Sequence, residues 1–286
     1  MKRVLVVLFS MGVSLVTTSV SSEGASDLVP LKTANENRGW EAVGRLNFGD
    51  VSYCTGALID ADLVLTAAHC LFDNSSGEQF AAEQIEFLPG WRNGRAEAYR
   101  HVRRVVVHPD FTYSSFDKVG RVAHDVALIQ LDQPIKSPSI IPYEVDIRPH
   151  KGTTVGVVSY ARERSDAASL QEECLVLARQ GGVLVLSCEV DHGASGSPVF
   201  IFDEGERPKI VSVISAMAMV KDQDVALGTT LTKPLALLKE MISRPAFDET
   251  TPALSVVSRG LPTVNTFSGL SAGGDSGGAK FLKPNQ

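Results

Sequence analysis

Residues 54–70 read CTGALIDADLVLTAAHC, two short apolar runs joined by a polar turn at 60–62. Runs of this length that flank a turn indicate two adjacent β-strands. Such a pair brings Cys54 and Cys70 together, and a disulfide between them would fix the loop that carries His69. Closing a loop of this size stabilises a fold by about 3 kcal/mol in the chain-entropy model. A histidine beside a cysteine is, taken alone, more often structural or a metal ligand, but the other histidines show no metal-ligand spacing.

The same kind of pattern continues on both sides of this stretch. Short apolar or alternating runs, broken by Gly, Pro, Asn and Asp, follow one another from about residue 40 to residue 238. This pattern is typical of an all-β chain. The strands that we expect are 40–48, 55–59, 63–66, 101–107, 126–131, 154–160, 175–178, 183–186, 197–202, 210–219 and 226–231. Their number and the chain length favour two small antiparallel six-stranded β-barrels over one sandwich.

The segments around these strands complete the expected domain organisation. Apolar residues at helical spacing in 234–242 predict a short C-terminal helix. Beyond it the sequence is rich in Gly, Ser, Thr and Pro, a composition that cannot bury enough surface to offset the entropy of ordering. The expected parts are a signal peptide (1–22), an N-terminal segment (23–39), a first β-barrel (40–132), a linker with several prolines (133–149), a second β-barrel with its closing helix (150–243) and a disordered tail (244–286).

The N-terminus carries the signs of export. Lys2 and Arg3 precede an apolar stretch, 4–16, that is too short for a bilayer span, and a Ser/Thr-rich segment follows it. We therefore expect a secreted or periplasmic protein with no stable membrane insertion after signal cleavage; the alternative is an uncleaved anchor. The four cysteines of the chain then suffice for two disulfides.

Composition excludes some classes of partner. The 286 residues are 44% hydrophobic and 21% charged, which is ordinary for a globular protein, and the formal net charge is −6. An acidic chain has no cationic surplus with which to hold a polyanion, so we expect no nucleic-acid partner.

Two further segments carry candidate chemistry. Asp125 opens the apolar strand in HDVALIQL (124–131), where it should be buried and should need a partner. The alternative for an isolated Asp is a turn cap at the strand entrance. In GASGSPV (193–199), glycines flank Ser195, and they permit the sharp turn that aims successive backbone N–H groups at one oxyanion.

Together these blocks resemble the chymotrypsin-like (trypsin-type) serine peptidase family. TAAHC (66–70), HDVALIQL and GASGSPV are similar to the family's His, Asp and Ser regions, and WEAV (40–43) and VVVHPDF (105–111) match further segments. The GxSGSP form of the serine block is more similar to the family's bacterial secreted members, including the glutamyl endopeptidase branch, than to its digestive trypsins. The resemblance implies that Ser195 is the nucleophile, His69 the general base and Asp125 the group that orients His69. Gly193 and Ser195 would supply the oxyanion-hole N–H groups, and no metal or cofactor is needed.

Other residues receive weaker assignments. The substrate pocket is expected to include Glu189, Val190, Ile214, Ser215 and Ala216. An acid six residues before the nucleophile resembles the position that selects Arg and Lys in trypsins, and the alternative makes Glu189 a solvent-facing residue. Val190 and Ile214 stand where the glutamyl endopeptidase branch would have Thr and His, which argues against glutamate specificity.

Two observations complete these expectations. Cys174 and Cys188 lie symmetrically about Gly181, so we expect them to cross-link a β-hairpin. The string GDSGG around Ser276 matches the family's commoner serine motif, but too few residues follow it to build a substrate pocket.

The sequence thus predicts a monomeric serine endopeptidase that acts on proteins or peptides. One alternative is a catalytically silent homologue that acts as a binding module. The other is an esterase with the same triad.

Overall fold

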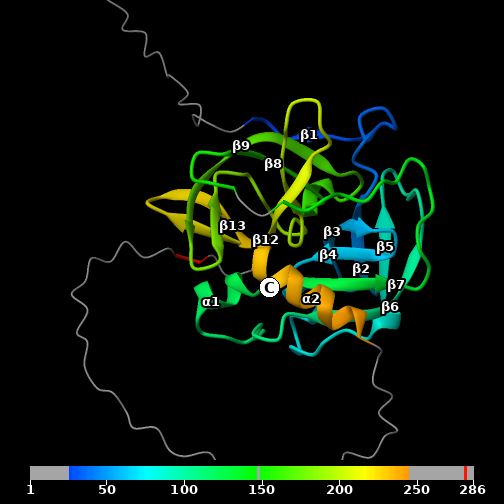
Figure 1. Ribbon diagram of the computed structural model, residues 1–286, viewed down its shortest axis with the longest axis horizontal. Coiled ribbons are helices and arrows are strands. Elements are labelled where there is room, and N and C mark those ends of the chain that lie inside the picture. Colours follow the sequence, from blue (N-terminus) through cyan, green and yellow to red (C-terminus); the bar gives the residue numbers. More distant parts are fainter. Residues whose placement is uncertain (1–25, 147–148, 245–279, 282–286) are drawn as a thin grey trace, which may run out of the picture.

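Two antiparallel β-barrels, formed by successive parts of the chain, lie side by side in the computed structural model (Figure 1). The structure describes residues 26–146, 149–244 and 280–281. The expected signal peptide and most of the expected tail, with Ser276, lie outside the described residues. The predicted fold class, two six-stranded barrels with a C-terminal helix, is confirmed.

The first barrel closes in the order β2-β3-β4-β7-β6-β5. Its strands are β2 (Val43–Phe48), β3 (Ser52–Asp60), β4 (Leu63–Thr66), β5 (Ile85–Pro89), β6 (Arg100–Val107) and β7 (Ala127–Leu131). Large apolar side chains that are fully buried, among them Phe48, Leu58 and Phe87, fill its interior.

The second barrel closes in the order β8-β9-β10-β13-β12-β11, because β8 also pairs with β9. Its strands are β8 (Thr154–Ser159), β9 (Ser169–Gln180), β10 (Val183–Leu186), β11 (Pro198–Ile201), β12 (Lys209–Val220) and β13 (Gln223–Thr230). Two short strands are added at its edges: β1 (Val29–Pro30) pairs with β9, and β14 (Lys280–Phe281) pairs with β12.

Helical segments are few. α1 (Lys118–Ala123) precedes β7, and α2 (Thr232–Ser243) packs on β6 and β7 of the first barrel. Three 3-10 turns are η1 (Ala68–Leu71), η2 (Ala82–Gln84) and η3 (Arg162–Arg164). No helix of the described ranges is long and apolar enough to span a bilayer.

The core of the first barrel extends to residues of the second, among them Tyr160 and Phe200, and the second barrel also has an apolar cluster of its own. Trp40 at the entrance to the first barrel, Tyr143 in the connecting segment and Phe200 of β11 form an aromatic group, with Tyr143 and Phe200 centroids 4.8 Å apart. The Tyr143 hydroxyl donates to the carbonyl of Gly39 at 2.7 Å. Since this shared apolar contact packs the two barrels against each other, their facing loops hold a defined geometry.

Two disulfides are present, and they join the pairs expected from the sequence. Cys54–Cys70 links β3 to η1, with the Cα atoms 6.2 Å apart. Cys174–Cys188 links β9 to the segment after β10.

Candidate active site

The short turn η1 positions His69 at the face between the barrels. It follows directly after β4, and the disulfide from Cys70 to Cys54 holds it against β3. The His69 side chain remains accessible at 18% relative exposure. Its ring is therefore anchored at the backbone and open to a cavity.

Asp125 lies two residues before β7 with 1% of its surface exposed, and three donors surround its carboxylate. His69 Nδ1 lies 2.6 Å from Oδ2, and the His69 backbone N–H donates to Oδ1 at 2.8 Å. The Ser215 hydroxyl also donates to Oδ2, at 2.5 Å. Burial raises the pKa of Asp125, but the charge of His69 and these hydrogen bonds together hold it below its ordinary value.

This arrangement fixes the tautomer of His69. An ionised carboxylate only accepts hydrogen bonds, so the bond to Asp125 places the Nδ1 hydrogen on His69. Nε2 of the neutral ring then carries a free lone pair. A histidine in this state is suited to take a proton from a hydroxyl on the far side of its ring.

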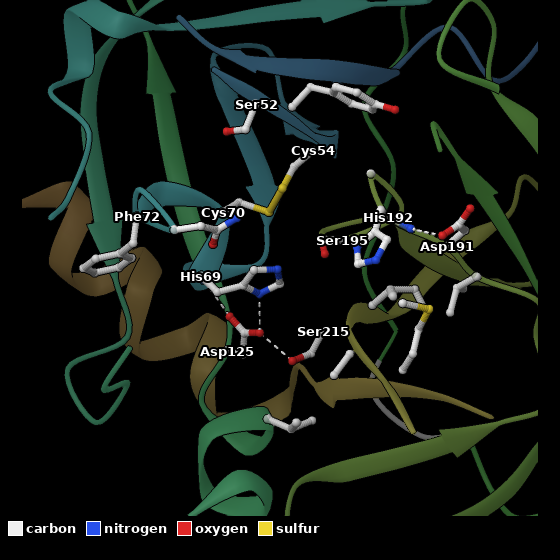
Figure 2. Close-up of a pocket in the computed structure, with 18 of the residues that line it drawn as sticks. Ser52, Cys54, His69, Cys70, Phe72, Asp125, Asp191, His192, Ser195 and Ser215 are labelled. Atoms are coloured by element: carbon white, nitrogen blue, oxygen red, sulfur yellow. Dashed lines mark hydrogen bonds and ion pairs between the residues drawn. A yellow bond between two sulfur atoms is a disulfide. The ribbon is translucent and has the colours of Figure 1, made fainter. Parts of the chain in front are cut away.

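Ser195 lies on a tight turn between Gly193 and Gly196, whose φ angles are +95° and +78°. At Gly196 a side chain would meet the Thr66 hydroxyl and the Thr55 carbonyl, so the turn requires glycine on steric as well as conformational grounds. His69 and Ser195 line the same cavity from opposite barrels (Figure 2). Their side chains share no direct hydrogen bond among the described residues.

The backbone N–H groups of this turn divide into two sets. Ala194 donates to the Asp191 carbonyl and Gly196 donates to the Ile214 carbonyl. The N–H groups of Gly193 and Ser195 have no acceptor among the residues that the structure describes. Two unpaired N–H groups beside a serine hydroxyl are the donors that an oxyanion requires.

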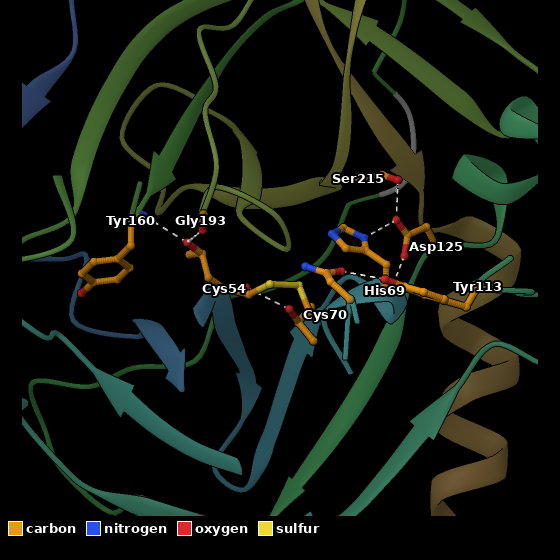
Figure 3. Close-up of a disulfide and its surroundings, with 11 residues drawn as sticks. Cys54, His69, Cys70, Tyr113, Asp125, Tyr160, Gly193 and Ser215 are labelled. Atoms are coloured by element: carbon orange, nitrogen blue, oxygen red, sulfur yellow. Dashed lines mark hydrogen bonds and ion pairs between the residues drawn. A yellow bond between two sulfur atoms is a disulfide. The ribbon is translucent and has the colours of Figure 1, made fainter. Parts of the chain in front are cut away.

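Thr55 of the first barrel braces this turn of the second. Its N–H donates to the Ser195 carbonyl at 2.9 Å, and its hydroxyl donates to the Gly193 carbonyl at 3.0 Å. The same hydroxyl accepts a bond from the Tyr160 N–H. Figure 3 shows Tyr160 and Gly193 beside the Cys54–Cys70 disulfide. The strand that carries the first disulfide therefore also holds the serine turn in place.

The cavity around these groups has a volume of about 720 Å³ and is lined by both barrels. Four of the five predicted pocket residues line this cavity: Val190, Ile214, Ser215 and Ala216. Ser215 does not offer its hydroxyl to the cavity, because that group donates to Asp125.

Glu189 requires a correction, because it does not line the cavity. Its side chain is exposed, and its backbone N–H donates to the Gln171 side chain at 2.8 Å. That bond ties the backbone at Glu189 to β9, away from the cavity. Glu189 is therefore a solvent-facing residue, as in the alternative interpretation of the sequence.

Two groups of ligand-type side chains lie close together among the described residues. The first contains Cys54 and Cys70, whose sulfurs are joined in a disulfide and cannot bind a metal. In the second, His108 Nδ1 accepts a bond from the Asp110 N–H at 3.2 Å. The hydrogen of the neutral His108 ring is then on Nε2, which leaves neither nitrogen free to ligate.

Sequence reasoning missed the partners of the predicted site. The sequence predicts Ser215 in the substrate pocket and Thr55 within a strand, but it does not predict their bonds to Asp125 and to the serine turn. A single polar residue within an apolar run is a signal that could have marked Thr55, because a buried hydroxyl needs a partner. No local signal connects Ser215 to Asp125, since 90 residues separate them.

Comparisons with known proteins agree on one family. The family model described as Trypsin matches residues 32–182, which include His69 and Asp125. A glutamyl endopeptidase from Bacillus licheniformis is 28% identical over 151 residues, covering 52% of this chain and 46% of that protein. Human serine protease 56 is 26% identical over 198 residues, 60% of this chain and 31% of that protein. These matches thus span less than half the length of the curated relatives.

A solved structure shares the fold. The structure of a Glu endopeptidase in complex with MPD superposes with a TM-score of 0.60 at 20% identity. It covers 78% of this chain and 98% of that chain.

Proposed function

The chain belongs to the trypsin family of serine peptidases, and we propose from this premise that it is an exported serine endopeptidase with a His69, Asp125 and Ser195 triad. The observation that carries the proposal is the bond from His69 to the buried Asp125, in the cavity that Ser195 lines. Two disulfides support an oxidising compartment, secreted or periplasmic.

In the proposed reaction Ser195 Oγ attacks the scissile carbonyl carbon while His69 Nε2 takes the hydroxyl proton. The carbonyl oxygen becomes an oxyanion, which the N–H groups of Gly193 and Ser195 stabilise. His69 returns the proton to the leaving amine, and the C–N bond breaks to give an acyl-enzyme. Water then attacks the ester with His69 again as the base, and the free acid and Ser195 are released.

The residue before the scissile bond faces an apolar surface. Val190, Ile214 and Ala216 line the cavity near the serine turn, and their side chains offer no donor to a carboxylate. Two of the similar proteins are glutamyl endopeptidases by name. We nevertheless favour apolar side chains at this position, because burial of apolar surface is what these residues can supply.

Ser195→Ala tests the proposal. We expect kcat for peptide hydrolysis to fall by about 10⁴-fold or more, since the variant lacks the nucleophile. Ser276→Ala, at the stronger sequence match, is the control and should keep full activity. Fluorophosphonate labelling with mapping of the modified residue should find Ser195.

The alternatives give different results in the same experiment. A silent binding module would take up no label and cleave no peptide. An esterase would be labelled at Ser195 but would hydrolyse activated esters and leave peptides intact. Labelling at Ser276, or full activity in Ser195→Ala, would refute the assignment of the nucleophile.

A further inference from the structure

The cavity has two halves that are lined by different kinds of residue. The proposed mechanism indicates which half binds the leaving segment of the substrate. His69 must deliver its proton to the leaving amine, so the leaving segment passes on the side of His69 and the adjoining Cys54–Cys70 disulfide. That half is lined by 51–54 at the start of β3 and just before it, by Arg162 and by 191–193. This assignment of sides rests on the proposed function.

Three arginines gather around Tyr53 in the leaving-group half. The guanidinium carbon of Arg45 lies 4.3 Å from the centroid of the Tyr53 ring. Arg162 lines the cavity, and both Arg45 and Arg162 lower the pKa of Tyr53 against the larger raising effect of its burial. Arg164 ends the same 3-10 turn and also interacts electrostatically with Tyr53.

None of these arginines forms an ion pair with a described residue. Arg45 Nε and Arg164 Nη1 are buried atoms without a hydrogen-bond partner. Burial lowers the pKa of Arg164, and the charges of Glu189 and Asp191 only partly oppose this effect. Arg45 and Arg164 are half-buried, whereas Arg162 is exposed and lines the cavity. A half-buried guanidinium group without an ion pair is costly to maintain, so an acidic group that approaches this cluster at Arg162 gains more than it would at an ordinary surface.

The turn that presents Arg162 is fixed next to the serine turn. The Arg162 N–H donates to the His192 carbonyl at 2.7 Å, and the Trp91 indole donates to the Ser165 carbonyl at 3.2 Å. Figure 2 shows His192 and Asp191 beside Ser195. A cationic group on this turn therefore lies near the residues that follow the scissile bond.

We propose that the leaving-group half selects substrates with an acidic residue one or two positions after the scissile bond, and that Arg162 binds its carboxylate with Arg45 and Arg164 behind it. A guanidinium presents paired N–H donors that match a carboxylate. The enzyme would thus combine an apolar residue before the cleaved bond with an acidic residue after it.

The test uses matched quenched fluorescent peptides that differ only after the scissile bond, with Asp, Asn or Lys at the first or second position. We expect kcat/KM to be about tenfold higher for Asp than for Asn, in line with a charge-assisted hydrogen bond, and lowest for Lys. In Arg162→Gln the ratio of Asp to Asn should approach one. The control Arg179→Gln, an exposed arginine of β9 outside the cavity, should keep the tenfold ratio.

Acyl transfer assigns the preference to the leaving-group side. With a common acyl donor, added aspartic acid amide should capture the acyl-enzyme more often than asparagine amide, and Arg162→Gln should abolish the difference. Equal cleavage of the Asp and Asn peptides, or a preference that survives in Arg162→Gln, would overturn the inference while leaving the peptidase assignment intact. Absence of cleavage of every peptide by a protein that takes up no fluorophosphonate would instead refute the proposed function.

Discussion

Thr55 shows how one hydroxyl connects the two barrels at the site. It is fully buried, and its hydroxyl joins the Gly193 carbonyl and the Tyr160 N–H, both from the second barrel. The Thr66 hydroxyl satisfies the Thr55 carbonyl at 2.9 Å. A side chain in the first barrel therefore determines the backbone position of a proposed oxyanion donor in the second.

Thr55→Val should weaken both stability and catalysis. Valine keeps the volume but leaves the Gly193 carbonyl and the Tyr160 N–H without this partner, at a cost of about 1–3 kcal/mol in the free energy of unfolding. We also expect a lower kcat, because the serine turn loses a brace. Urea unfolding and steady-state kinetics measure the two effects.

Thr55→Ser is the matched control for this prediction. It keeps the hydroxyl, so its kcat should remain close to that of the wild type. Equal kcat in the Val and Ser variants would show that the bridge does not position the serine turn.

Residue types at the site were predictable where they form local motifs. His69, Asp125 and Ser195 each stand in a short block, and the structure places the three on one cavity. Ser215 at Asp125 and the arginines around Tyr53 depend on strands that meet only in the folded chain. The sequence places Glu189 in the pocket only because it stands six residues before Ser195. That spacing does not reveal the bond from the Glu189 backbone N–H to the Gln171 side chain.

Secondary-structure elements were predictable where apolar alternation is strong. β4 and β10 have the predicted bounds, 63–66 and 183–186, and α2 begins two residues before the predicted 234–242 and ends one after it. β5 and α1 were not predicted. α1 has only six residues and contains Gly120, so helix propensity gives no signal, and the Asp117 cap on the Gly120 N–H stabilises its first turn instead.

Two histidines join the end of β6 to the end of α1 just before Asp125. The rings of His108 and His124 stack with centroids 4.9 Å apart. Burial lowers the pKa of His108, and the neighbouring His124 lowers it further, while Asp110 raises it. His108 accepts the Asp110 N–H at Nδ1, a bond that protonation would remove.

Acidification should therefore destabilise the protein through His108. A histidine with a lowered pKa binds fewer protons when folded than when unfolded, so stability increases with pH in this range. Its contribution is complete above about pH 6.5, the ordinary histidine value, and is lost as the pH falls through the lower value of the folded state. Urea unfolding between pH 8 and pH 5 measures this loss.

His108→Asn is the informative variant, because the amide oxygen can replace Nδ1 as the acceptor and does not titrate. We expect its unfolding free energy to vary less with pH over the same interval. The same pH dependence in both proteins would assign the acid sensitivity to other groups.

At the scale of the whole molecule, the number of strands predicts the two-barrel architecture. It does not predict that the C-terminal helix packs back on the first barrel. α2 follows the last strand of the second barrel and packs on β6 and β7 of the first, as Figure 1 shows. Arg104 of β6 donates to the carbonyls of Met241, Ile242 and Arg244. These bonds satisfy carbonyls that a helix end leaves unpaired, and a cation there also suits the helix dipole.

A pair of truncations tests whether the fold is complete at this helix. A chain that ends at Arg244 keeps both barrels, both disulfides, the proposed triad and the Arg104 bonds, and among described contacts it loses only the pairing of β14 with β12. We expect its Tm and kcat/KM to match those of the full chain. A chain that ends at Leu231 lacks α2, and with it the buried Leu235 and Leu238.

The chain that ends at Leu231 should be severely destabilised. Burying two leucines contributes roughly 3–6 kcal/mol, which is comparable with the whole stability of many domains. Removal of α2 also exposes the apolar surface of the first barrel that this helix covers, so we expect a large fall in Tm or aggregation. If the chain ending at Arg244 lost most of its activity, the C-terminal segment would be part of the working enzyme. If the chain ending at Leu231 had the same Tm as the full protein, the packing of α2 on the first barrel would not contribute to stability.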